Sequence, residues 1–349
     1  MKKSKEVYKK IAWSLFAVLL AGLSIWAVAA QSKTLSIPKM MSHLRTASPL
    51  WLGVAVLCML GYIFFEGEAV LCILRSTGYT RKHTSGFVYA AADVYFSAIT
   101  PSATGGQPAS AYFMIRDGAP GATTTMALIL NLVMYTLTTM TIGVLCLVIR
   151  PGMYFQFTFL SRVLIVIGFV IILGLGLFFY MMLRHKSILH SLLDKLLRFL
   201  ERIKLIRHLK ARQRKLKRMM AEYEQVVIQV AGQYPMLIKV YLLNLAQRVS
   251  QITVTMAMYL ATGGVASRAV DAWITQGYVV IGSSCVPVPG AMGIADYLLY
   301  DGLGELVPPD RVADLELLSR GLSFYSCIII SGITIVIGYW IRRKRSLYC

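Results

Sequence analysis

The sequence predicts an all-α polytopic membrane protein, and two observations carry that prediction. Of its 349 residues, 57% are hydrophobic and only 15% are charged, with a mean hydropathy of +0.63. Soluble domains are nearer half apolar and about a quarter charged. The apolar residues are also gathered into runs of about twenty, the length that a helix needs to cross a ~30 Å hydrocarbon layer.

Six segments have the length and composition of full transmembrane spans. They are residues 11–30, 49–66, 122–149, 160–183, 236–261 and 321–341. The first follows a basic start, but it is too long for the apolar region of a signal peptide, so we predict a retained span. Basic residues are concentrated on one side of this arrangement, and the positive-inside rule then places both termini and residues 184–235 in the cytoplasm.

The net charge of +20 lies mostly in blocks of Lys and Arg beside the spans. Such blocks orient a membrane protein and attract anionic lipid, so we expect no nucleic-acid partner. The longest block belongs to residues 184–235, where leucine and isoleucine recur at helical spacing between the cations. That pattern predicts a basic amphipathic insertion that binds anionic lipids at the cytoplasmic membrane surface.

Two further apolar stretches are broken in the middle by Pro and Gly. Residues 84–116 and 271–303 are each too interrupted for an ordinary span, and we interpret both as re-entrant hairpins. Each stands between two spans, which divides the chain into two halves, 49–149 and 236–341, of opposite orientation. Broken segments at matching places in inverted halves are typical of transporter binding sites. The alternative is a pair of kinked helices without a function, because Gly and Pro are common in membrane helices.

The helix starts inside these hairpins predict an anion site. A helix that begins after Gly106 or after Gly293 leaves backbone N–H groups unpaired and presents the positive end of its dipole. Two such starts near the membrane midplane suit a lipid phosphate. The residues predicted to bind the lipid or its phosphate are Pro101, Ser102, Thr104, Gly105, Gly106, Gln107, Asn244, Arg248, Gln251, Pro287, Pro289, Gly290, Gly293 and Asp296.

Arg248 is the most informative of these residues, because an arginine at mid-span costs about 2.5–3.5 kcal/mol on insertion scales. It belongs to a polar stripe on one helix face, which must face protein or water rather than lipid. Two interpretations stay open: a cation for the lipid phosphate, or an ion pair with Asp93 or Asp296. Asp296 itself suits either a helix cap or contact with a cationic head group. Glu66 and Glu68 are expected at a solvated helix end.

Enzymatic constellations are missing from the sequence. All five histidines lie outside the predicted spans, and neither HExxH nor a phosphate-binding glycine loop occurs. None of the six cysteines forms a CxxC pair, so no disulfide framework or metal site is expected. We therefore predict no catalytic residues and no cofactor.

The two breaks resemble a known family. The segments TPSATGGQP at 100–108 and PVPGAMG at 287–293, the latter followed by Asp296, are similar to the lysylphosphatidylglycerol synthase transmembrane-region family, which includes the membrane half of the bacterial multiple peptide resistance factor. The chain differs at Ala291, where many relatives have Gly, and at Asp296, where many have Glu. Gln107 and Ser110 stand where some relatives carry an acidic residue and an arginine. These differences bear on which head group is recognised.

The resemblance implies a lipid flippase of the bacterial cytoplasmic membrane that moves an anionic or aminoacylated phospholipid such as lysylphosphatidylglycerol. In bifunctional relatives a separate cytosolic domain joins lysine to phosphatidylglycerol. The sequence ends shortly after its last span, so that domain is expected to be absent. The alternatives are a phosphatidylglycerol lysyltransferase or its membrane subunit, and a flippase for polyprenyl-linked lipids. The oligomeric state stays open, a homo-oligomer included.

Overall fold

The computed structural model describes residues 46–100, 103–202, 209–284 and 293–345, and the regular structure within them is helical. The predicted first span, 11–30, lies outside these residues. In chain order the helices are α3 (Pro49–Ser76), α4 (His83–Ile99), α5 (Gly106–Arg116), α6 (Gly121–Ile149), α7 (Pro151–Gln156), α8 (Phe159–Arg184), α9 (Lys186–Arg202), α10 (Leu209–Ala231), α11 (Tyr234–Ala261), the short 3-10 turn η2 (Ala266–Arg268), α12 (Ala269–Ser283), α13 (Ile294–Leu303), α14 (Pro309–Arg320), the π-helical turn η4 (Gly321–Ser326) and α15 (Cys327–Arg345).

Four helical stretches in the described part are long and apolar enough to cross a membrane. They are α3, α6, α8 and the continuous run Arg311–Arg342 that ends in α15. Helix α11 qualifies only together with α10, from which it is bent by 91°. Helix α11 does not qualify alone because the amide and guanidinium side chains of its polar stripe lower the mean hydropathy of an otherwise apolar helix. The chain is therefore an all-α polytopic membrane protein.

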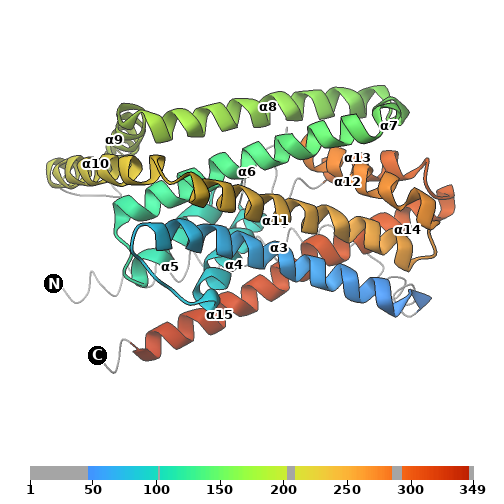
Figure 1. Cartoon of the computed structure of the whole chain (residues 1–349), viewed down its shortest axis with the longest axis horizontal. Helices are drawn as coiled ribbons and strands as arrows, with labels where there is room; N and C mark the ends of the chain where they lie inside the picture. Colours follow the sequence, from blue (N-terminus) through green and yellow to red (C-terminus); the bar gives the residue numbers. More distant parts are fainter. Residues whose placement is uncertain (1–45, 101–102, 203–208, 285–292, 346–349) are drawn as a thin grey trace.

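The long helices α3, α6, α8, α11 and α15 run along the length of the molecule (Figure 1). Helix α3 packs most extensively against α11, α6 packs against α8, and α4 packs against α15. Many apolar side chains of α8 and α15 face outward, as expected for helices in contact with lipid; Val170 and Ile333 are examples. The core is thus formed where α3, α4, α6, α11 and α12 meet.

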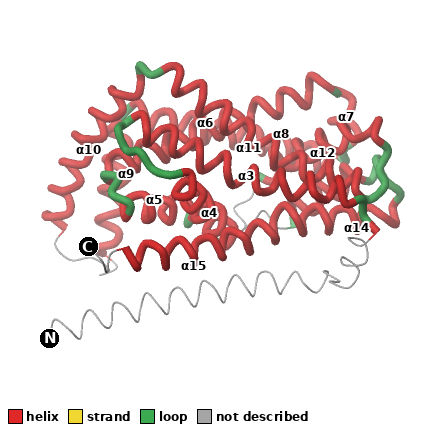
Figure 2. Tube along the Cα trace, turned by 60° about the horizontal axis from the view of Figure 1, so that its bottom comes forward, coloured by secondary structure: helices red, strands yellow, loops and turns green. Residues whose placement is uncertain are grey.

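Both Pro/Gly-broken stretches form two short helices that fold back on each other. Helices α4 and α5 pack together, as do α12 and α13. In two views the first hairpin lies toward the end of the bundle that holds α9 and α10, and the second toward the end that holds α7 and α14 (Figures 1 and 2). The described helices of the two hairpins therefore lie toward opposite ends of the long helices.

The basic insertion consists of two described helices, α9 and α10, which pack on each other; α10 also packs on α6, and α9 on α8. Helix α9 covers Lys186–Arg202, and residues 203–208 lie outside the described residues. Leu189 on α9 and Tyr223 on α10 are buried against the bundle, whereas Leu196 and Phe199 on α9 stay exposed. Helix α9 therefore buries some of its apolar side chains against the protein and leaves others exposed.

Candidate functional site

The polar stripe of α11 faces protein along its whole length. Asn244 donates to Asn131 Oδ1 on α6 at 3.0 Å, and Thr255 donates to Gln276 Oε1 on α12 at 3.0 Å. Between them Gln247 Nε2 donates to Glu66 Oε2 on α3 at 3.0 Å. The stripe thus joins α11 to three neighbouring helices through hydrogen bonds that lipid would not supply.

Arg248 is 2% exposed, and its guanidinium lies among polar and aromatic groups rather than against a carboxylate. Its Cζ stands 3.8 Å from the centroid of the Tyr135 ring, a close cation–π contact, and one N–H donates to Gln251 Oε1. Its Nε has no hydrogen-bond partner. Within the described residues Arg248 makes no ion pair with Asp93 or Asp296, one of the two interpretations left open; the other, a cation for a lipid phosphate, stays a prediction.

Glu66 corrects a prediction, because it is buried rather than solvated at a helix end. It is 6% exposed, and α3 continues past it for ten residues to Ser76. The following turns of α3 are apolar and buried by neighbouring helices, which the carboxylate alone could not reveal. The carboxyl group of Glu66 interacts electrostatically with that of Asp93 on α4 and with Arg248.

The prediction of a solvated Glu68 is also wrong, since its side chain is only 11% exposed. It pairs with Arg75 at 3.4 Å and with His83 at 2.5 Å.

Asp93 occupies the helix start that was predicted to receive a phosphate. Gln107, in the first turn of α5, donates to Asp93 Oδ2 at 2.7 Å, and Ser97 donates to Oδ1 at 3.1 Å. A Cβ at Gly106 would lie 1.9 Å from Asp93 Oδ1 and 2.1 Å from Ser97 Oγ. Only glycine at this position lets the carboxylate approach the positive end of α5. We call Glu66, Asp93, Gln247, Arg248 and Tyr135 the first-half cluster.

The start of α13 in the second hairpin is also met by a carboxylate of the chain. Gly293 adopts a φ of 83°, and its N–H donates to Asp296 Oδ2 at 2.8 Å. Asp296 Oδ1 pairs with Arg320 Nε at 2.7 Å, and Glu316 interacts electrostatically with both residues. Arg320 also lies 5.0 Å from the ring centroid of Phe324, in the π-helical turn that precedes α15. We call Asp296, Glu316 and Arg320 the second-half cluster.

The predicted residues are thus brought together in part. Asn244, Arg248 and Gln251 lie on the buried face of α11, with Gln107 and Gly106 joined to them through Asp93 and Glu66. Gly105 donates its N–H to Thr100 Oγ1 at 2.8 Å, and Thr104 is exposed. Asp296 and Gly293 belong to the other cluster. Outside the described residues lie Pro101, Ser102, Pro287, Pro289 and Gly290.

Sequence reasoning missed Glu66, Tyr135, Glu316 and Arg320 as members of these clusters. For Glu66 a signal existed, since apolar residues continue on both sides of it in the sequence. A carboxylate inside an apolar run marks a functional or paired position in a membrane helix. For Glu316 and Arg320 the surrounding sequence is that of an ordinary polar helix, and only packing places them against Asp296.

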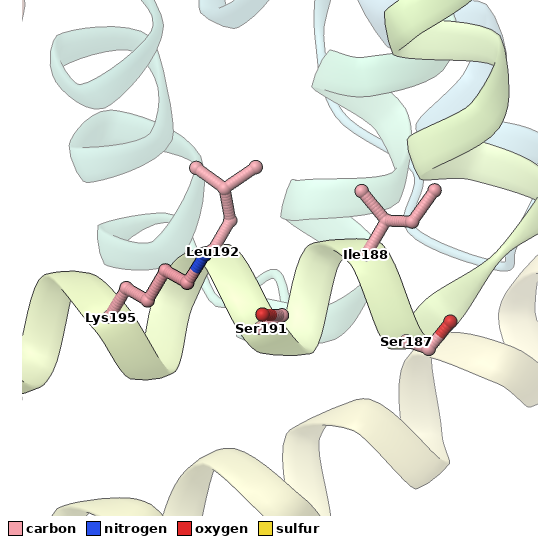
Figure 3. Close-up of a pocket in the computed structure, with 5 residues that line it drawn as sticks. All are labelled: Ser187, Ile188, Ser191, Leu192 and Lys195. Carbon is pink, nitrogen blue, oxygen red and sulfur yellow. The ribbon is translucent and has the colours of Figure 1, made fainter.

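A shallow cavity of about 310 Å³ lies away from both clusters, on α9 alone (Figure 3). It is lined by Ser187, Ile188, Ser191, Leu192 and Lys195. All five belong to α9, so the cavity is a shallow depression on the surface of one amphipathic helix. Among the described residues no group of three or more His, Cys, Asp or Glu side chains is arranged to hold a metal ion.

A comparison with models of known protein families identifies the family to which the chain belongs. The model of the lysylphosphatidylglycerol synthase TM region matches residues 13–331, nearly the whole chain. The chain belongs to this family. The resemblance inferred from the two Pro/Gly breaks is therefore confirmed. A search of curated protein sequences gives no match.

Proposed function

We propose that this protein moves a phospholipid between the leaflets of the bacterial cytoplasmic membrane, with its termini and the α9–α10 insertion on the cytoplasmic side. The observation that supports this most is Arg248, a cation buried at the middle of a membrane helix that makes no ion pair within the described residues. Burying such a charge costs about 2.5–3.5 kcal/mol, which a purely structural helix has no reason to bear. A lipid phosphate is the natural partner in a lipid transporter.

The neighbours of Arg248 favour an aminoacylated head group over a plain anion. The carboxyl groups of Glu66 and Asp93 interact electrostatically, and Glu66 also interacts with the positive charge of Arg248. A head group such as that of lysylphosphatidylglycerol carries both signs, with its phosphate suited to Arg248 and its ammonium groups suited to Glu66 and Asp93.

We propose that Asp93 and the lipid phosphate compete for the start of α5. Asp93 now holds the place at Gly106 where an incoming phosphate would bind. A head group whose ammonium draws Asp93 away would free that place for its own phosphate. Binding would then exchange one charge pair for another, without leaving a charge unpaired in the bilayer.

Transport of labelled phospholipid in proteoliposomes tests the proposal. We expect Arg248→Gln to reduce flipping of lysylphosphatidylglycerol at least tenfold, because one charge-assisted hydrogen bond contributes about 1.5–3 kcal/mol. Lys239→Gln is the matched control, since Lys239 is an exposed cation on the same helix. Full transport by a folded Arg248→Gln protein would refute the role of Arg248. Polyprenyl-linked lipid in the same vesicles tests the alternative substrate.

A role in lipid synthesis is the second candidate, because the family is described by its synthase activity. In that case the chain would be a phosphatidylglycerol lysyltransferase or the membrane subunit of one. Purified protein supplied with lysyl-tRNA and phosphatidylglycerol tests this directly. We expect no lysylphosphatidylglycerol, since neither described cluster places a nucleophile beside a base.

A further inference from the structure

A cavity of about 710 Å³ lies between the start of α4 and the last turns of α15, and it shares no residue with either cluster. Figure 1 shows α15 passing beneath α4 at this end of the bundle. The lining has a polar part from the α3–α4 loop and the first turn of α4, and an apolar part from the next turn of α4 and from α15. The apolar part includes Phe87, Val88, Ile337 and Ile341.

The polar part carries an excess of positive charge. Three cations line it, Arg81, Lys82 and Arg342, against a single carboxylate, Asp117, which leaves a net charge of +2. Arg342 is the cation that is neutralised, because its Nε and a terminal nitrogen contact both oxygens of Asp117 at 2.7 and 2.6 Å.

Arg81 and Lys82 are the cations left over. Arg81 donates only to the backbone carbonyls of Thr80 and Asp117, and Lys82 makes no ion pair within the described part of the chain. Both side chains are exposed.

The wall behind these cations is held in place by a closed set of hydrogen bonds. Tyr89 donates to Asp117 Oδ2 at 2.6 Å from the same face as Arg342. Burial raises the pKa of Asp117, but the hydrogen bonds from Arg342 and Tyr89 outweigh it, so the pKa lies below its usual range and the group stays ionised. Arg75 fixes the loop by donating to the carbonyl of Arg81 at 3.0 Å. The cavity is therefore built before any ligand arrives.

The start of α4 adds donors to the same place. No side chain caps this helix; the N–H of Ser85 donates to the carbonyl of Lys82 at 2.9 Å, and the positive end of the helix dipole lies beside the lining. Thr84 and Ser85 bring hydroxyl groups to the lining. The helix dipole, the hydroxyls and the two exposed cations together favour a phosphate.

The apolar part shows which phosphate compound fits. Ile337 and Ile341 belong to the membrane-spanning run Arg311–Arg342, and both are more than half exposed. A ligand that reaches from Lys82 to Ile337 must have an anionic end and a hydrocarbon end. We propose that this cavity binds an anionic glycerophospholipid, with the phosphodiester at Arg81, Lys82 and the α4 start and an acyl chain along α15. The site is independent of lipid transport, and of Arg248.

Native mass spectrometry of the purified full chain tests this site, with phosphatidylglycerol and phosphatidylcholine of identical acyl chains as probes. We expect selective binding of phosphatidylglycerol, weakened about tenfold by the double variant Arg81→Gln/Lys82→Gln, the effect of losing one charge-assisted hydrogen bond. Lys239→Gln/Arg311→Gln is the matched control, because it removes the same charge from exposed positions outside both the cavity and the basic insertion. The Arg248→Gln protein should keep the selective binding, which separates this site from the transport site.

A second variant, in another part of the cavity, distinguishes a loss of lipid binding from misfolding caused by the loop substitutions. Ile337→Glu places a carboxylate in the apolar part of the cavity on an exposed helix face, and we expect it to abolish the preference for phosphatidylglycerol. Equal binding of the two lipids by the unaltered protein would overturn the proposal. So would selective binding that survives both cavity variants, or inorganic phosphate that displaces phosphatidylglycerol at equal concentration.

Discussion

The first-half and second-half clusters use the same chemical groups in different ways. Each places an aspartate at the start of the second helix of a broken hairpin, with a glutamate that interacts electrostatically with that aspartate and an arginine near by. In the second half Arg320 contacts Asp296 directly, at 2.7 Å. In the first-half cluster Arg248, which α11 of the second half supplies, contacts an aromatic ring and an amide instead, and its Nε has no hydrogen-bond partner.

Arg320 stabilises the structure through an ion pair. Arg248 makes no ion pair within the described residues and is the cation that we propose for ligand binding. A guanidinium paired with a carboxylate has its field largely cancelled at short range. A guanidinium over a tyrosine ring keeps most of its charge, because a cation–π contact contributes only about 0.5–2 kcal/mol. The first-half cluster is therefore the better candidate for lipid recognition, although both helix starts looked equal in the sequence.

The glycines at the two breaks differ as well. At Gly106 the requirement is space, since a Cβ would lie 1.9 Å from Asp93 Oδ1 and 2.6 Å from the backbone oxygen of Asp93. At Gly293 a Cβ would have no atom within 4 Å, but the φ of 83° is one that L-residues rarely adopt. One break depends on close packing and the other on backbone conformation.

The largest expected effect follows from the packed break. Gly106→Ala should destabilise the protein by about 3 kcal/mol, because the backbone of α4 blocks the new methyl group and cannot move aside as a side chain can. A thermal melt in detergent measures this. Gly174→Ala, on the exposed face of α8 with nothing within 4 Å, is the control and should be neutral or slightly stabilising. Equal melting of the two variants would mean that α5 does not approach α4 this closely.

A smaller effect is expected from breaking the ion pair. Arg320→Gln should lower stability by about 2 kcal/mol, because it removes a charge-assisted contact and leaves Asp296 and Glu316 facing each other. Arg248→Gln should lower it by less, since no ion pair is lost and the cost of burying a cation disappears. Melting curves of the two variants side by side check this order. The reverse order would contradict the division of roles between the two clusters.

The smallest effect is expected at the conformational break. Gly293→Ala should cost about 1–2 kcal/mol, the penalty for an L-residue in the left-handed region. Gly293→Asn should cost less, because asparagine tolerates that region better. Chemical denaturation of both variants measures the difference. If alanine and asparagine are equally costly, the loss comes from contacts rather than from φ.

The membrane class and the helix pattern could be predicted because they depend on local composition. A run such as 122–149 must be a span, since no other structure satisfies twenty apolar residues in lipid. Pro and Gly in the segments 84–116 and 271–303 break helices whatever surrounds them. The polar stripe of α11 was also readable, because the positions of Asn244, Gln247 and Arg248 on one helix face follow from helical periodicity alone.

The sequence by itself determined the all-α membrane fold, the family, and the residues that cannot face lipid. Only the tertiary structure decided the partners of those residues. Glu66 is buried because α11 brings Gln247 to it across a gap of 181 residues, and Asp296 pairs with Arg320 rather than Arg248 because α14 packs beside α13. The physical reason is that the type of a side chain alone decides whether it can face lipid. The electrostatic energy between two charges depends instead on the distance between them in the folded protein.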